Sequence, residues 1–228
     1  MGEASDRDRD DRIATRMDDL RAQREVPYLI PLGGSTPLGA AAYAAAVPEL
    51  VGQLSGKPVT HLVIAAGSLG SMAGLILGTW TSGLDCQVHG YTVLWPEAEA
   101  MTRLQELLEA ARGQSFPAVA ARSNYRILGS QLGAGYGGPT AAGLEAARLA
   151  ARHDGLLLDH TYTAKAMAGL IQGIRKGSYT PPRPGHLLPH RGTGRILRLP
   201  PPRRLIVPQR GNRGTNNTQA DIYRGNDH

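Results

Sequence analysis

The sequence contains one cysteine, Cys86, and no apolar run long enough to cross a bilayer. A single cysteine excludes an intrachain disulfide and a metal site built on several thiolates, so no metal is expected. The N-terminus is charged where a secretory signal peptide would be apolar. These absences predict a cytoplasmic protein with no membrane partner.

The net positive charge of the chain comes from its C-terminal end. From Arg183 onward there are nine arginines and two acidic residues, a net charge of +7, whereas the whole chain of 228 residues carries +6. Residues 181–208 hold eight prolines, and residues 212–228 are polar without apolar periodicity. We therefore expect a disordered Arg/Pro-rich tail over 181–228. It lacks a known nucleic-acid-binding module, so no nucleic-acid partner is expected, although binding through these arginines is the alternative.

Residues 1–180 alternate between helical and strand patterns. Apolar spacing predicts helices over 5–24, 38–54, 69–80, 97–112, 140–151 and 163–176. Short apolar runs predict strands over 27–32, 61–66, 86–93 and 156–158, and residues 125–138 read as a glycine-rich loop. Alternating strands and helices indicate an α/β domain, with a parallel sheet covered by helices on both faces.

The segment Ala65-Ala66-Gly67-Ser68-Leu69-Gly70-Ser71 lies between a buried strand and a helix. Glycines let successive backbone N–H groups converge, the helix N-terminus adds its dipole, and serines add hydroxyls. The segment therefore predicts a phosphate cradle. The alternative is a tight strand-to-helix turn without a ligand.

Two further motifs are candidate site segments. Gly135-Tyr136-Gly137-Gly138 holds a tyrosine among glycines, where its ring can face a ligand, although an ordinary surface loop is the alternative. Asp159-His160-Thr161-Tyr162-Thr163 follows a predicted strand, and ligand sites in parallel sheets gather at the carboxyl ends of strands. Alternatively, Thr163 is only the N-cap of the helix that follows.

In order and spacing, three segments resemble the family of D-cysteine desulfhydrase and 1-aminocyclopropane-1-carboxylate (ACC) deaminase: PYLIPLGGSTPLGA (27–40), VIAAGSLGSMAGL (63–75) and GLLLDHTYTAKAMAGLI (155–171). These are fold-type II pyridoxal 5'-phosphate enzymes, related to the tryptophan synthase β subunit. The resemblance extends over about residues 8–180. It implies a tryptophan synthase β-like fold, with a large cofactor-binding domain over 1–180 and a homodimeric full-length protein.

The resemblance also implies roles for single residues. Gly67, Ser68, Leu69, Gly70 and Ser71 would hold the cofactor phosphate, with Leu69 where the family usually has glycine and Ser71 where it usually has threonine.

The remaining implied roles bear on the reaction. Tyr136 and Tyr162 match the family's two catalytic tyrosines beside cofactor and substrate, and Thr163 matches the residue that faces the pyridine nitrogen. A threonine there, where the deaminases have glutamate, holds that nitrogen protonated less well and favours β-elimination of sulfide. The implied reaction converts a small amino acid such as D-cysteine to pyruvate, ammonia and hydrogen sulfide. Alternatives are ACC deaminase-like activity and a non-catalytic protein that binds pyridoxal phosphate or a partner.

The chain departs from the family in two places. The family's Schiff-base lysine belongs to an upstream segment, and Lys57, Lys165 and Lys176 do not match it; we expect an incomplete domain, inactive as this chain. The tail should contain an apolar-His-Thr-Gly-Gly segment, and codons for Leu188 to Gly192, read one nucleotide later, permit Phe-His-Thr-Gly-Gly. This indicates a frameshift before Leu188; the alternative is a genuine basic linker.

Overall fold

The computed structural model describes residues 6–54 and 56–179. The predicted tail lies outside these residues. No described helix is long and apolar enough to span a membrane, and no group of three or more candidate metal ligands occurs in the part of the chain that is described.

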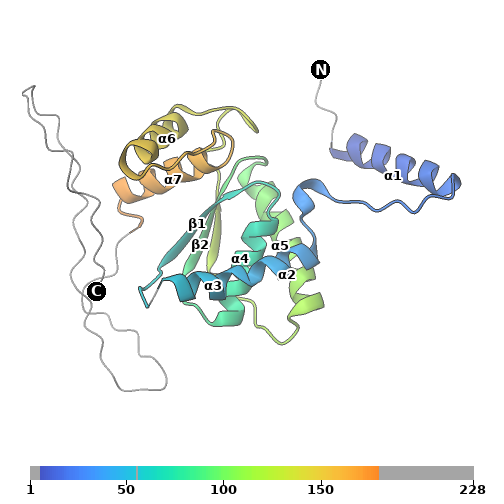
Figure 1. Ribbon diagram of the computed structural model, residues 1–228, viewed down its shortest axis with the longest axis horizontal. Helices are drawn as coiled ribbons and strands as arrows, with labels where there is room; N and C mark the ends of the chain where they lie inside the picture. The colour runs from blue at the N-terminus through green and yellow to red at the C-terminus, as the bar shows by residue number, and fades with distance from the viewer. Residues whose placement is uncertain (1–5, 55, 180–228) are drawn as a thin grey trace, which may run out of the picture. The chain divides into compact units, whose positions relative to one another are not determined.

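Three parallel strands form the centre of the domain (Figure 1). They are β1 (His61–Ala66), β2 (Gln87–Thr92) and β3 (Tyr125–Leu128), in the order β1-β2-β3. In register, His61 lies beside Gln87 on β2, and Val88 lies beside Tyr125 on β3. All three carboxyl ends therefore lie at one edge of the sheet, as predicted for a parallel α/β domain.

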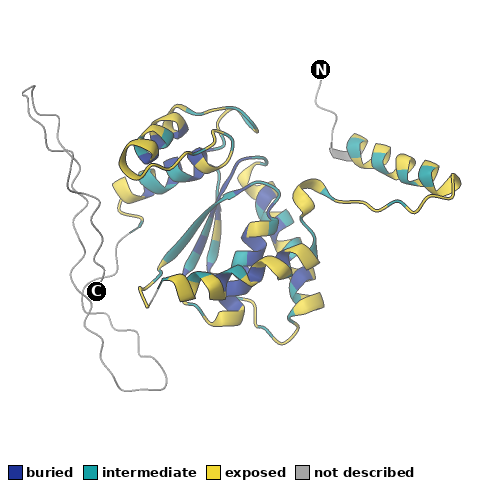
Figure 2. Cartoon of the chain, viewed as in Figure 1, coloured by how far each residue is buried: buried dark blue, intermediate teal, exposed yellow. Residues whose placement is uncertain are grey.

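One face of the sheet carries the main hydrophobic core. The crossover helices α4 (Gly70–Ser82) and α5 (Glu97–Ser115) pack on it, and α2 (Pro37–Ala44) and α3 (Ala46–Gln53) pack on α4. Figure 2 shows that the buried residues are concentrated where these helices face each other and the strands. The large side chains that this core buries completely include Met72, Ile76, Leu77, Val88 and Leu104.

The other face is covered by two helices. α7 (Thr163–Arg175) packs on β1 and β2, and α6 (Ala141–Asp154) packs on α7 (Figure 1). The expectation of helices on both faces is therefore confirmed. α7 approaches the sheet closely because Gly169 faces the ring of Tyr91, a buried residue of β2.

We expect Gly169→Ala to destabilise the domain. A Cβ at this position would lie 2.2 Å from Tyr91 Cε1, and overpacking of this kind costs about 1–3 kcal/mol. Gly113→Ala in α5 is the matched control, because a Cβ there meets nothing within 4 Å; helix propensity alone predicts a gain of about 0.8–1 kcal/mol. Urea unfolding measures both, and equal stability of the two variants would contradict close packing of α7.

Most predicted elements are present with small shifts in their ends. The N-terminal helix is α1 (Asp6–Ala22), and Thr140 caps α6 by accepting the Gly143 N–H at 3.0 Å. The helix predicted over 38–54 is divided into α2 and α3 at Ala45. Pro48 accounts for the break, because it has no N–H for a helical hydrogen bond to Ala44.

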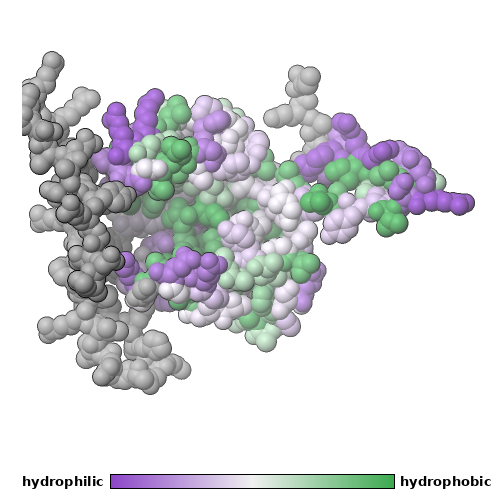
Figure 3. Space-filling view, viewed as in Figure 1, coloured by the Kyte–Doolittle hydropathy of each residue, from purple (hydrophilic) through white to green (hydrophobic). Residues whose placement is uncertain are grey.

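Two strand assignments and part of one loop assignment were wrong. Residues 27–32 and 156–158 are not strands, because a strand needs a neighbour for its backbone hydrogen bonds. Their side chains are instead exposed, notably Tyr28, Ile30 and Leu157; Figure 3 shows apolar side chains on the surface of the segment that follows α1. Conversely, residues 125–128, predicted as part of a loop, pair with β2 as β3.

Candidate functional site

The predicted phosphate loop lies between the carboxyl end of β1 and the start of α4. Leu69 has a φ of 72°, in the left-handed region that favours glycine, at a cost of about 1–2 kcal/mol for a residue with a Cβ. Its side chain is only 4% exposed and belongs to the hydrophobic core. Burial of this side chain therefore holds the loop in a conformation that the usual glycine would adopt without strain.

The loop and the first turn of α4 present unpaired donors. Within the described residues, the N–H groups of Ser71 and Met72 and the hydroxyls of Ser68 and Ser71 have no hydrogen-bond partner, whereas the Gly70 N–H is taken by Ser35 Oγ at 3.1 Å. Backbone N–H groups and hydroxyls at a helix N-terminus are the donor set that phosphate groups prefer. The residues present therefore fit a phosphate.

A turn around Ser35 packs directly against this loop. Gly33 has a φ of 65°, and a Cβ on it would lie 2.0 Å from Ser68 Oγ, so glycine is required. Thr36 then caps α2 by accepting the Gly39 N–H at 2.9 Å. Sequence reasoning assigned no role to Ser35, although its Gly-Gly-Ser-Thr setting resembles a family segment.

The two predicted tyrosines meet beside the loop. The hydroxyls of Tyr136 and Tyr162 are hydrogen bonded, and their ring centroids lie 5.8 Å apart. A Cβ on Gly67 would lie 3.1 Å from Tyr162 Cε1, so the Tyr162 ring rests on the loop. The hydrogen bond between the Tyr162 and Tyr136 hydroxyls, with smaller contributions from burial and Asp159, raises the pKa of Tyr162. The predicted phosphate loop, the Tyr136 loop and the Tyr162 segment are therefore in contact in the folded chain, although they are far apart in sequence.

Lys165 ties the glycine-rich loop to α7. Its side chain is fully buried, and Nζ donates to the carbonyl oxygens of Leu132 and Gly135, both at 2.9 Å. Burial lowers the pKa of this amine. No sequence signal indicates this role, because a lysine in a helix usually reaches solvent. Its position fixes the backbone next to Tyr136.

We expect Lys165→Met to lower the pKa of Tyr162 toward that of an ordinary phenol. Without the two hydrogen bonds the loop that carries Tyr136 loses its anchor, so the tyrosine pair separates. Ultraviolet titration of tyrosinate, compared with the same titration of Tyr162→Phe, isolates this group. Lys176→Met, an exposed lysine at the end of α7, is the control. An unchanged pKa of Tyr162 in Lys165→Met would contradict the anchoring role.

Asp159 holds the start of α7. Its carboxylate accepts the backbone N–H groups of Thr161, Tyr162 and Thr163, and also the Thr163 hydroxyl. Burial acts to raise the pKa of Asp159, but these hydrogen bonds, led by that of the Thr163 hydroxyl, outweigh it and hold the pKa at about 2. The side chain that caps this helix is therefore Asp159, not Thr163, the N-cap considered from sequence.

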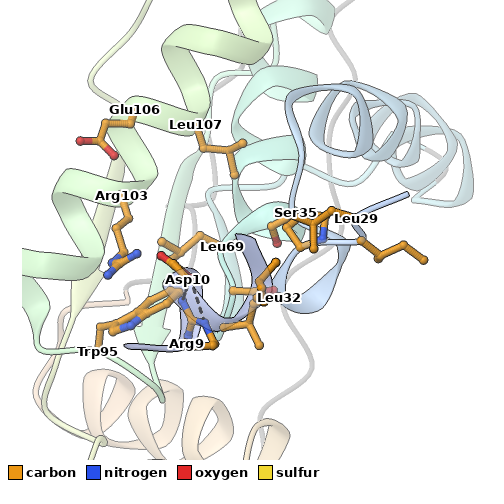
Figure 4. Close-up of a pocket in the computed structure, with 14 residues that line it drawn as sticks. Arg9, Asp10, Leu29, Leu32, Ser35, Leu69, Trp95, Arg103, Glu106 and Leu107 are labelled. Atoms are coloured by element: carbon orange, nitrogen blue, oxygen red, sulfur yellow. Dashed lines mark hydrogen bonds and ion pairs between the residues drawn. The ribbon is translucent and has the colours of Figure 1, made fainter. Parts of the chain in front are cut away.

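A cavity of about 630 Å³ borders the same loop (Figure 4). Ser35, Ser68 and Leu69 line one part of it, and Trp95 and Arg103 another. The Arg103 guanidinium lies 4.6 Å from the centre of the Trp95 ring. Neither Tyr136 nor Tyr162 lines this cavity. The loop therefore borders the cavity through Ser68 and Leu69 and contacts Tyr162 through Gly67.

Comparisons with known proteins agree with this arrangement. Residues 3–184 match the family model described as "Pyridoxal-phosphate dependent enzyme". The chain is 40% identical over 163 residues to D-cysteine desulfhydrase of Salmonella typhi and to that of Salmonella paratyphi C (strain RKS4594), which is 71% of this chain and 48% of each relative. The chain thus spans about half the length of these relatives.

One solved structure, that of an ACC deaminase homologue, is similar over most of the domain. The two chains are 29% identical and align with a TM-score of 0.67, over 77% of this chain and 53% of the homologue. The tryptophan synthase β-like fold expected from the sequence is therefore confirmed for the part that aligns.

Proposed function

Since the chain belongs to the family of pyridoxal-phosphate dependent enzymes, we propose that residues 1–180 form the cofactor-binding large domain of a lyase resembling D-cysteine desulfhydrase. The observation that carries this proposal is the convergence at the carboxyl end of β1. There Gly67 contacts Tyr162, Gly70 bonds to Ser35, and Tyr162 bonds to Tyr136.

The cofactor phosphate would be held by residues 67–71. The N–H of Ser71 and the hydroxyls of Ser68 and Ser71 are unpaired among the described residues and suit a phosphate dianion. Leu69 contributes its N–H, and Gly67 and Gly70 allow the ligand close to the backbone. Because the Gly70 N–H already bonds to Ser35, Ser35 shapes the cradle and leaves the neighbouring donors for the ligand.

The tyrosine pair would take part in proton transfer at the α-carbon of the substrate. Pyridoxal phosphate, when bound, withdraws electrons from the amino-acid α-carbon. A phenol is protonated at neutral pH, and the raised pKa of Tyr162 makes its hydroxyl a still weaker acid. The hydrogen bond with Tyr136 gives that proton a path between the two oxygens. Thr163, next to Tyr162, would face the pyridine nitrogen.

The proposed substrate is a small amino acid, and the proposed reaction is β-elimination that releases sulfide, pyruvate and ammonia from D-cysteine. The similarity to the relatives named D-cysteine desulfhydrase supports it. The structural similarity to an ACC deaminase homologue favours the ring-opening deaminase reaction as the second candidate. The homodimer and the cytoplasmic location stay predictions from the sequence.

Calorimetric titration of the full chain tests the proposal. We expect pyridoxal phosphate to bind more tightly than pyridoxal, because only the former carries the dianion that the loop fits. Equal affinities would contradict the phosphate site. Because none of Lys57, Lys165 and Lys176 matches the family's Schiff-base lysine, we expect neither sulfide release from D-cysteine nor consumption of ACC by this chain. Turnover of either compound would contradict that expectation and would show which of the two candidate reactions the protein catalyses.

A further inference from the structure

The hydrogen bonds of Thr163 restrict what its hydroxyl can offer a ligand. A hydroxyl has one proton and two acceptor lone pairs. Thr163 Oγ1 lies 2.6 Å from Asp159 Oδ2, and it accepts the Asp159 N–H at 2.9 Å. A third contact, to the Asp159 carbonyl oxygen, is longer at 3.4 Å and competes poorly for the proton.

One lone pair of Thr163 is therefore left. Asp159 Oδ2 is a carboxylate oxygen that can only accept, so the short contact assigns the hydroxyl proton to it. Toward any third group, Thr163 is then an acceptor alone. The side chain is exposed, and it follows Tyr162, whose ring lies against Gly67 of the phosphate loop.

We propose that Asp159 is a positioning residue that fixes the Thr163 hydroxyl as a hydrogen-bond acceptor, so that Thr163 receives a donor, the N–H of a protonated pyridine ring. This inference rests on the proposed function, which puts Thr163 opposite the ring nitrogen. A threonine alone is expected to hold the ring nitrogen protonated poorly. With the Asp159 carboxylate bonded to it, the Thr163 hydroxyl can only accept, and this favours the protonated nitrogen.

The carboxylate is suited to this role at neutral pH. The hydrogen bonds from Thr163, Tyr162 and Thr161 hold Asp159 ionised, with a pKa of about 2 despite partial burial. Those from the backbone also fix its orientation, so the oxygen facing Thr163 is not free to turn away. A charged, oriented acceptor behind a hydroxyl strengthens that hydroxyl as an acceptor in turn.

Nitrogen NMR of the full chain with pyridoxal phosphate labelled with ¹⁵N in the ring tests the inference. For the unaltered chain we expect the chemical shift of a protonated ring, at a pH where the free ligand is unprotonated. In Asp159→Asn, the side-chain amide donates to Thr163 Oγ1 and releases the hydroxyl proton toward the ligand. The resonance should then move to that of an unprotonated ring. Asp154→Asn, an exposed carboxylate at the end of α6, should leave it unchanged.

The outcomes separate the two proposals. No binding by the unaltered chain contradicts the proposed function. Binding with an unprotonated ring, or a protonated ring retained in Asp159→Asn, contradicts only the role of Asp159. If Asp159→Asn does not fold, judged by its helical circular dichroism, Thr163→Val takes its place. That variant keeps Asp159 as the cap of α7 and should also lose the protonated signal; a retained signal would overturn the inference.

Discussion

Gly70→Asp is expected to weaken binding of pyridoxal phosphate by about 100-fold, the equivalent of about 2.8 kcal/mol. The new carboxylate would stand at the first residue of α4, beside the unpaired donors of Ser71 and Ser68. Two unit charges 4 Å apart near a protein surface repel by about 4 kcal/mol, and solvent screening reduces this. Calorimetric titration measures the change directly.

Two controls separate charge from shape. Gly70→Ala adds the same Cβ, 2.6 Å from Ser35 Oγ and 3.2 Å from Ser35 Cα, but no charge, so we expect a smaller loss of affinity than in Gly70→Asp. Gly113→Asp places the same charge on an open part of α5 and should leave affinity unchanged. Binding of pyridoxal, which lacks the phosphate, should respond far less to Gly70→Asp. Equal loss for both ligands would show that the substitution acts through folding.

Asn124→Leu is expected to destabilise the domain by about 3–5 kcal/mol, since each buried polar group left unpaired costs about 1–3 kcal/mol. The Asn124 amide accepts the Trp80 indole N–H at 2.7 Å and donates to Cys86 O at 2.8 Å and Thr79 Oγ1 at 3.1 Å. All three partners are buried. The loss is a large fraction of the stability of an ordinary domain. A lower urea midpoint at unchanged m-value would measure it.

A double-mutant cycle checks the cause of that loss. Trp80→Phe removes the indole donor, so in its background Asn124→Leu should cost about 1–2 kcal/mol less. Strict additivity of the two substitutions, or a loss below about 1 kcal/mol for Asn124→Leu alone, would mean that this amide does not hold α4 to the strands.

The local elements of the fold can be read from the sequence because their causes are local. β1 is a continuous apolar run followed by glycine, and its predicted ends match the observed ones. Thr140 is correctly predicted to start α6, because a threonine side chain satisfies a free helix N–H. By contrast, residues 27–32 and 156–158 have strand-like sequences but no strand beside them, and pairing is what makes a strand.

For the site too, some residues could be identified from the sequence and others only from the folded chain. Residue types and glycine spacing along short segments were enough to identify the family and to select the phosphate loop and the two tyrosines as candidates. Only the folded chain shows that Ser35 closes the Gly70 end of the cradle and that Lys165 anchors the Tyr136 loop. The same is true of the contact through which Asp159 takes the proton of Thr163. Whether a hydroxyl donates or accepts, and whether a lysine reaches solvent, depends on which atoms surround it after folding.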